Sequence, residues 1–207
     1  MNIPQLEIPT GLVKVAAYDP LTEVHGPGKR FALWLQGCPI LCPGCINPEM
    51  LSEQGGSDMR VTQITSLIRR SVLGGFPVEG VTFMGGEPMM QARAVADILD
   101  WCRKNTNLNT LLFSGYTLEA LRQNGDANVK RILDMLDTLI DGPYIQSKRS
   151  MGDIRGSSNQ KIHHLNDRRL QGASFERKTA EFIVDESCTE GAGVIQTGFR
   201  PDQIIKP

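Results

Sequence analysis

The stretch that decides the fold reads Phe31-Ala-Leu-Trp-Leu-Gln-Gly-Cys-Pro-Ile-Leu-Cys-Pro-Gly-Cys-Ile-Asn-Pro48. Its first six residues are mostly apolar and end at Gly37, a pattern that predicts a buried strand delivering a loop to one edge of a sheet. The loop carries Cys38, Cys42 and Cys45 in the spacing C-x3-C-x2-C, with two prolines and a glycine among them. Because these residues break a helix, the three thiols can turn toward one another.

The chain has five cysteines, and no second pair lies near this loop to complete an ordinary four-cysteine metal site. Thiolates are natural ligands of a [4Fe–4S] cluster, and a cluster held by three of them leaves one iron free to bind a reacting molecule. An open coordination position is typical of a catalytic site. We therefore predict that Cys38, Cys42 and Cys45 ligate such a cluster.

A zinc-binding structural or interaction module is a second interpretation of the same cysteines. It would need a distant fourth ligand, such as Cys188 or a histidine. Zinc sites normally show a second close pair of ligands, so this interpretation is disfavoured.

The composition is that of an ordinary globular protein, with 207 residues, 40% of them hydrophobic and 22% charged, and a net charge of −1. No long linker-like run divides the chain, so we expect one domain over residues 1–207, with a core at about 12–165 and a C-terminal extension at 166–207. The charge gives no reason to expect nucleic acid or an anionic membrane as a partner. We also expect a cytoplasmic protein, because neither a secretory signal nor a membrane-spanning run is recognisable.

Periodic apolar segments predict alternating strands and helices. An alternation of this kind predicts an α/β fold with a mainly parallel sheet, whose functional loops gather at the carboxyl edge. A complete eight-fold barrel needs roughly 250 residues, so we expect a partial, open barrel of the (β/α)6 type. Strands are expected at residues 12–18, 31–36, 80–84, 110–113, 138–140 and 180–184, and helices at 61–73, 92–104, 118–124 and 128–135.

The cysteine loop is followed forty residues later by Gly85-Gly86-Glu87-Pro88 at the end of an expected strand. Together the two motifs resemble the radical S-adenosylmethionine superfamily. The resemblance implies that the fourth iron of the cluster binds the amino and carboxylate groups of S-adenosylmethionine. It also implies that an electron from the cluster cleaves this cofactor to release a 5′-deoxyadenosyl radical, with the protein positioning and shielding the chemistry.

The same resemblance implies that Gly85, Gly86, Glu87 and Pro88 receive the methionyl amino group. Two glycines let a ligand approach the backbone, Pro88 fixes the turn, and an anionic Glu87 favours an ammonium group. Ser114 and Asp141, at later strand ends, are further candidates for binding the ribose or carboxylate of the cofactor. Ordinary turn chemistry accounts for Ser114 and Asp141 equally well.

Within this superfamily, the chain is most similar to the small glycyl-radical-enzyme activases, in particular the activating proteins of anaerobic ribonucleotide reductase. Two features depart from the family pattern: His25 stands where an acidic residue often precedes Gly-Pro-Gly, and the chain runs longer at its C-terminus than the smallest activases. Gly44 stands where many superfamily members carry an aromatic residue, although Pro43-Gly44 resembles this branch. The motifs that carry the similarity are His25-Gly-Pro-Gly-Lys-Arg30, Cys42-Pro-Gly-Cys-Ile-Asn-Pro48, Ser114-Gly-Tyr-Thr117, Asp141-Gly-Pro-Tyr144 and Arg155-Gly-Ser-Ser-Asn-Gln160.

The similarity implies an enzyme that abstracts hydrogen from a polypeptide, with a glycine of a partner glycyl radical enzyme as the leading substrate. The alternative is a maturase of a ribosomally made peptide, for example a splicease that excises part of a residue with the help of a small peptide-recognition protein. Either enzyme would need a reductant such as flavodoxin or ferredoxin.

Overall fold

The computed structural model describes residues 3–75, 77–166, 173–176, 181–185 and 193–197. The strands form a main sheet and, apart from it, an antiparallel pair made of β8 (Glu181–Asp185) and β9 (Gly193–Thr197). The strands of the main sheet are β1 (Leu12–Thr22), β2 (Arg30–Leu35), β3 (Ser57–Arg60), β4 (Gly80–Gly85), β5 (Asn109–Ser114), β6 (Thr138–Asp141) and β7 (Lys161–His164).

The main sheet has seven strands in the order β3-β1-β2-β4-β5-β6-β7. Its centre is parallel: β2 pairs with β4, β4 with β5 and β5 with β6. The register aligns the strand ends, since Leu35 is opposite Gly85 and Ser114 is opposite Asp141. The loops that follow these strands therefore start from one carboxyl edge.

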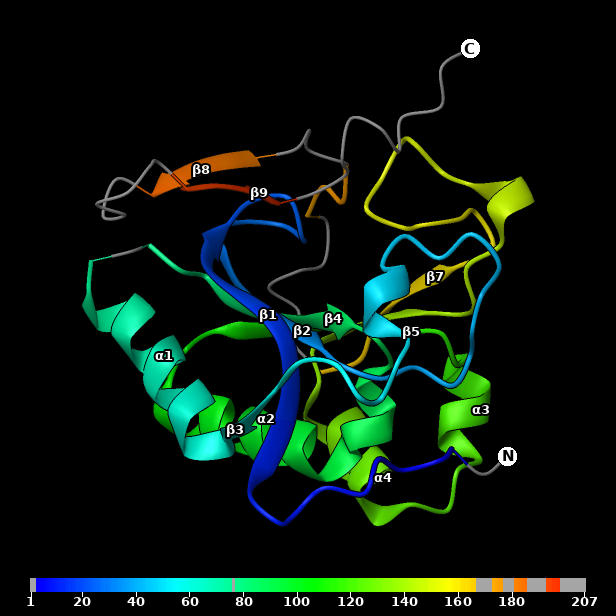
Figure 1. The fold of residues 1–207 in the computed structure, drawn as a ribbon, viewed down its shortest axis with the longest axis horizontal. Helices are drawn as coiled ribbons and strands as arrows, with labels where there is room; N and C mark the ends of the chain where they lie inside the picture. Colours follow the sequence, from blue (N-terminus) through cyan, green and yellow to red (C-terminus); the bar gives the residue numbers. More distant parts are fainter. Residues whose placement is uncertain (1–2, 76, 167–172, 177–180, 186–192, 198–207) are drawn as a thin grey trace.

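The α-helices of the described residues lie on one side of this sheet (Figure 1). Strand residues of alternating position, such as Phe31, Leu33, Val81 and Phe83, pack with the apolar faces of the helices to form the core. The helices are α1 (Val61–Leu73), α2 (Ala92–Asn105), α3 (Leu118–Arg122) and α4 (Ala127–Met135), with short 3-10 turns η1 (Pro48–Met50), η2 (Pro88–Gln91) and η3 (Gln146–Lys148). None of the helices in the described residues has the length and apolar character needed to cross a bilayer.

The structure confirms the α/β class and every helix and strand that the periodicity predicted. The expected six-fold barrel is not confirmed: four strands form the parallel centre, and antiparallel strands extend the sheet on both sides in the described residues. The sequence did not predict β3 and β7. Both are short edge strands, with sequences Ser-Asp-Met-Arg and Lys-Ile-His-His whose residues are exposed or half-buried, so they lack an alternating apolar pattern.

Candidate cluster and cofactor site

The two predicted motifs lie against each other at the carboxyl edge of the sheet. The Gly86 amide donates to the Leu35 carbonyl at 2.7 Å, and the Glu87 amide donates to the Gly37 carbonyl at 2.8 Å. A Cβ atom at Gly86 would collide with the Gly37 backbone, immediately before Cys38. Glycine is therefore required here by a close approach of two backbones, and it brings the Gly85–Pro88 turn against the cysteine loop.

The thiols of the cysteine loop are half-buried and lie near backbone donors. Burial raises the pKa of the Cys38 thiol to about 11 and also raises the pKa of Cys45. Amide groups of Ile40 and Leu41 act on Cys38 in the opposite direction, and that of Asn47 does so on Cys45. Such donors stabilise a thiolate once metal binding has displaced its proton.

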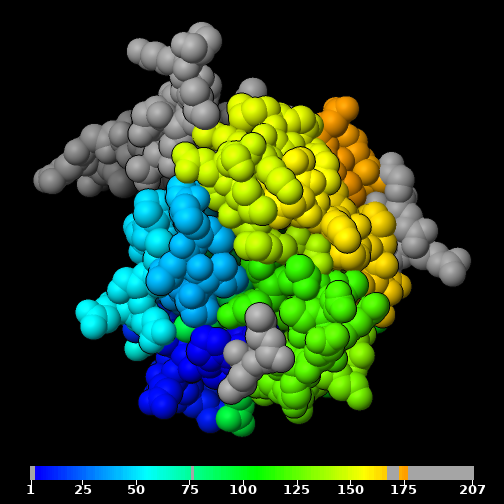
Figure 2. Space-filling view, turned by 90° about the vertical axis from the view of Figure 1, so that its right-hand side faces the viewer, coloured from blue at the N-terminus to red at the C-terminus, as the bar shows by residue number. Residues whose placement is uncertain are grey.

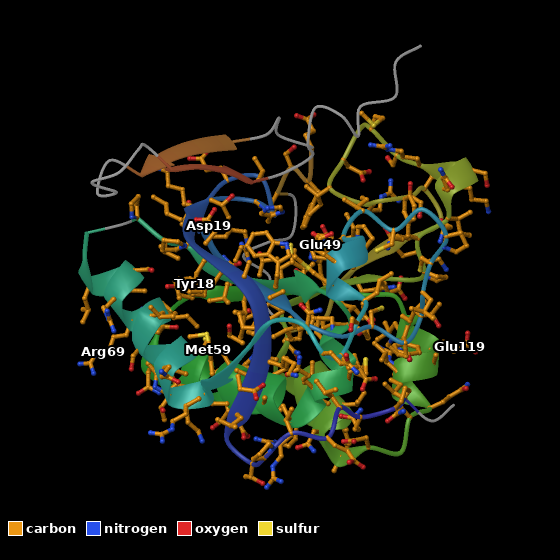
Figure 3. All side chains as sticks on the ribbon, in the orientation of Figure 1. Tyr18, Asp19, Glu49, Met59, Arg69 and Glu119 are labelled. Atoms are coloured by element: carbon orange, nitrogen blue, oxygen red, sulfur yellow. The ribbon has the colours of Figure 1, made fainter. Side chains whose placement is uncertain are left out.

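Cys42 lies close enough to both other cysteines to raise the pKa of each. Between Cys38 and Cys42, Leu41 has a left-handed backbone with φ of 50°, which turns the loop back on itself. Glu49, which is labelled in Figure 3, lies on η1. It adds a further negative charge near Cys45. The loop thus offers three neighbouring thiols, two of them close to backbone amide donors, and this donor set fits an iron–sulfur cluster.

Among the described residues, no three or more His, Cys, Asp or Glu side chains gather around one point as ligands of a single metal ion, and this includes the three thiols of the loop. A single zinc ion needs such convergence, whereas each thiolate of a [4Fe–4S] cluster binds a different iron. Cys188, which the zinc interpretation invoked, lies outside the described residues.

The Glu87 side chain is turned into the protein. Its carboxylate accepts hydrogen bonds from the Met89 amide at 3.0 Å, the Ser114 hydroxyl at 2.9 Å and the Gly115 amide at 2.8 Å. Burial raises its pKa to about 7, against the effect of these donors. The carboxylate therefore joins the end of β4 to the end of β5, and the binding of the methionyl amino group near it stays a prediction.

Ser114 and Asp141 are likewise engaged by protein groups. The Ser114 hydroxyl donates to Glu87 and accepts from the Tyr116 amide at 3.1 Å. Asp141 is buried; its carboxylate accepts from the Leu118 amide at 2.5 Å, at the start of α3, and from the Lys161 amide at 3.3 Å. Both residues stand at the predicted edge, and their binding of the cofactor stays a prediction.

Tyr116 is a residue of this region that the sequence analysis did not single out as part of the site. Burial first, then the charges of Glu87 and Cys38, raises the pKa of its hydroxyl to about 12. A Cβ atom at Gly115 would collide with the side chain of Ile40 in the cysteine loop. The segment after β5 therefore packs directly on the loop that carries the thiols. Its motif Ser-Gly-Tyr-Thr was the only signal of this in the sequence.

The Arg155–Gln160 motif binds the loop that follows β6. The side-chain amide of Gln160 donates to the Gly142 carbonyl, and the side-chain amide of Asn159 donates to the Pro143 carbonyl, each at 2.8 Å. The Ile145 amide donates to the Ser157 hydroxyl at 3.1 Å. The sequence predicted a polar loop for this motif. In the structure, its side chains form hydrogen bonds that fix the backbone of residues 142–145.

The loop after β6 and the cysteine loop meet at the surface of the molecule. Figure 2 shows the segment around residue 40, in light blue, beside the segment around residue 150, in yellow. Leu41, in the cysteine loop, is 62% exposed, so this part of the loop lies at the surface of the described residues.

Comparisons with known proteins identify chains that share this sequence pattern. A family model described as 4Fe-4S single cluster domain matches residues 24–163. The chain is 32% identical over 152 residues to the anaerobic ribonucleoside-triphosphate reductase-activating protein of Vibrio cholerae, covering 72% of this chain and 96% of the relative. The protein of that name from Escherichia coli strain K12 is 29% identical over 153 residues, with the same coverage, and that from Enterobacteria phage T4 is 27% identical over 146 residues, covering 69% of this chain and 88% of the relative.

Among solved structures, a crystal structure of QueE from Escherichia coli matches with a TM-score of 0.40 and 19% identity. The match covers 51% of this chain and 53% of that chain.

Proposed function

Because the chain belongs to the 4Fe–4S single cluster domain family, we propose that it activates a glycyl radical enzyme of the anaerobic ribonucleoside-triphosphate reductase class. The reaction would abstract a hydrogen atom from a glycine of that partner. The observation that carries this proposal is the match to the Vibrio cholerae activating protein over 96% of the length of that relative.

The resemblance to radical S-adenosylmethionine enzymes is confirmed, and with it the cofactors, a [4Fe–4S] cluster and S-adenosylmethionine. The chain is an enzyme of this kind that acts on a protein. When bound, these cofactors supply a 5′-deoxyadenosyl radical. The identity of the protein substrate belongs to the proposal.

In the proposed enzyme, Cys38, Cys42 and Cys45 hold the cluster through their thiolates. Backbone groups of the Gly85–Pro88 turn receive the methionyl end of the cofactor, because two glycines leave the backbone accessible to a ligand. Glu87 contributes by joining two strand ends through its three hydrogen bonds. A turn that is rigid before the cofactor binds loses little conformational entropy on binding.

The exposed position of the cysteine loop supports a protein substrate. A loop of the partner can approach the cofactor from the side where Leu41 is exposed and can itself exclude water.

We further propose a flavodoxin or ferredoxin as the electron donor and a single catalytic domain over residues 1–207. The peptide-maturation alternative has no support among the relatives named above, which are all activating proteins.

The test is anaerobic incubation of the cluster-loaded protein with S-adenosylmethionine, a reductant and purified anaerobic ribonucleoside-triphosphate reductase. We expect a glycyl radical signal on the reductase by electron paramagnetic resonance, and 5′-deoxyadenosine in comparable amount. Both should be absent with Cys42→Ala. If 5′-deoxyadenosine forms while the reductase stays free of radical, and a short peptide changes mass permanently instead, the enzyme is a maturase.

A further inference from the structure

A glutamine side chain occupies the space in front of Gly44 in the cysteine loop. Gly44 has φ of 72° and lies between Cys42 and Cys45. A Cβ atom built on it would stand 2.8 Å from both Cδ and Oε1 of Gln146. The left-handed backbone favours glycine at this position, and the absence of a side chain leaves the space that the Gln146 carboxamide occupies.

The backbone on both sides of Gln146 is held by hydrogen bonds. Before it, the Ile145 amide donates to the Ser157 hydroxyl at 3.1 Å. After it, the Lys148 carbonyl accepts from the Ser158 amide at 2.7 Å, and the Arg149 amide donates to the Gln146 carbonyl at 3.1 Å. The Arg155–Gln160 motif therefore fixes the place from which this side chain starts.

The carboxamide of Gln146 itself makes no hydrogen bond within the described residues, and the residue is exposed. A glutamine side chain has several rotatable bonds, and ordering it is unfavourable by about 1–2 kcal/mol unless a contact offsets this. Within the described part of the chain, a well-fixed backbone thus presents an amide group, with two N–H donors and a carbonyl acceptor, that has no hydrogen-bond partner beside two predicted cluster ligands. That arrangement suits a ligand which binds next to the cluster.

We propose that Gln146 recognises the adenine base of S-adenosylmethionine and determines the specificity for that base. The amino and carboxylate groups of the cofactor are charged, so iron or the Gly85–Pro88 turn is a better partner for them than the neutral carboxamide of Gln146. The adenine edge instead presents an N6 donor beside an N7 acceptor, and a carboxamide matches this pair with two parallel hydrogen bonds. Gln146 carries both groups, and its Cδ and Oε1 lie beside Gly44 in the cysteine loop.

The test compares binding of two unreactive probes to the cluster-loaded protein under anaerobic conditions. S-adenosylhomocysteine carries adenine, whereas S-inosylhomocysteine carries hypoxanthine, in which an O6 acceptor replaces the N6 donor. The wild-type protein should bind the adenine probe more tightly by roughly 5- to 150-fold, the range expected for one bidentate contact. Equilibrium dialysis gives both dissociation constants without requiring turnover.

In Gln146→Ala and in the apolar, similarly long Gln146→Met, the preference should fall at least about fivefold, through weaker binding of the adenine probe. Ser147→Ala, the exposed neighbour on the same turn, should keep the wild-type preference. Gln146→Glu should also lose affinity for adenine, because a carboxylate repels N7. Equal binding of both probes by the wild-type protein would overturn the assignment, as would an unchanged preference in Gln146→Ala. This binding test includes no polypeptide substrate. The role of Gln146 can therefore be wrong while the proposed activation is correct, and the proposed activation can be wrong while the role of Gln146 is correct.

Discussion

At the scale of single residues, the site depends on glycines that let two backbones meet. Gly86 is the clearest case, because its α-carbon faces the Gly37 backbone at the start of the cysteine loop. The neighbouring Glu87 amide donates to the Gly37 carbonyl. A methyl group at position 86 would have to push the Gly85–Pro88 turn away from the loop that carries the thiols.

Gly86→Ala should therefore lower the free energy of unfolding by about 1–3 kcal/mol, the usual result of overpacking. It should also reduce the iron bound per chain after reconstitution, because Cys38 follows the displaced backbone. Gly125→Ala is the matched control: a Cβ atom there meets nothing, and the same change should be neutral or slightly stabilising. Urea unfolding gives the free energy of unfolding of both variants, and iron analysis gives the iron bound per chain. Equal values in Gly86→Ala and Gly125→Ala would contradict the packing argument.

Glu87 predicts a pH dependence of stability in the cluster-free protein. Burial raises its pKa to about 7 in the folded chain, from about 4.5 when unfolded, so the native state holds its proton more tightly. The free energy of unfolding should therefore decrease as the pH rises from about 4.5 to 7, by on the order of 3 kcal/mol at most from this group. Glu87→Gln, which cannot ionise, should lack this decrease in urea titrations between pH 4.5 and 7.5.

His25 predicts the opposite dependence over an overlapping range. Burial of the ring lowers its pKa to about 4, and the ring packs edge-on against Trp34. The unfolded chain takes up a proton near pH 6.5, so this group makes the free energy of unfolding decrease as the pH falls from about 6.5 to 4. His25→Phe, which keeps an aromatic ring against Trp34, should remove that decrease.

The two groups partly cancel in the wild-type protein, so each single variant should show a steeper pH profile than the wild type. The double variant, Glu87→Gln with His25→Phe, should be flat with respect to both groups. A wild-type profile as steep as that of either single variant would mean that one of the two directions is wrong.

At the scale of elements, the Arg155–Gln160 motif acts as a clamp on the loop after β6. Gln160 is its centre: its amide nitrogen donates to the Gly142 carbonyl, and its amide oxygen accepts from the Gly156 and Ser157 amides. Removing this side chain leaves several buried polar groups without partners.

Gln160→Ala should lower the free energy of local opening of residues 142–149 by about 1–3 kcal/mol. Hydrogen exchange followed by mass spectrometry should show faster exchange in that segment, while β2 and β4 stay protected. Ser158→Ala, an exposed position of the same motif, is the control and should leave exchange unchanged. Equal exchange rates of residues 142–149 in the wild type and in Gln160→Ala would contradict the role of a clamp.

The elements also show which parts of the structure a sequence can predict. The helix α1 was predicted with its observed bounds, because its apolar residues recur at helical spacing over 13 residues. Edge strands β3 and β7 were missed, since strands with no fully buried face need no alternating pattern. For the site, the cysteines and the Gly85–Pro88 turn were visible as motifs. Gln146 was not, because its meaning depends on a contact with Gly44 across about one hundred residues.

The direction of Glu87 was equally beyond the sequence. Its place in the motif predicts an anionic group near the methionyl ammonium, and this stays a prediction. The three protein donors that its carboxylate accepts from could not be predicted, because rotamers are decided by packing. The motif identified the residue correctly as part of the edge and left its orientation open.

At the scale of the whole molecule, the helices cover one side of the sheet, and the cysteine loop lies at an exposed edge (Figures 1 and 2). We therefore expect a cluster bound there to be accessible to oxygen when the chain is alone. If the proposed partner docks over Leu41 and the cysteine loop, it shields the cluster as it supplies its glycine.

We therefore expect the anaerobic reductase, added at saturating concentration, to slow bleaching of the cluster in air several-fold. The measurement is the decay of the iron–sulfur charge-transfer absorbance after mixing with aerated buffer, in the presence of an S-adenosylmethionine analogue that cannot be cleaved. An unrelated protein of similar size at the same concentration should have no effect. Leu41→Asp, which places a charge on the exposed side of the loop, should weaken the protection by raising the concentration of reductase required. Equal bleaching with and without the reductase would place the docking surface elsewhere on the molecule.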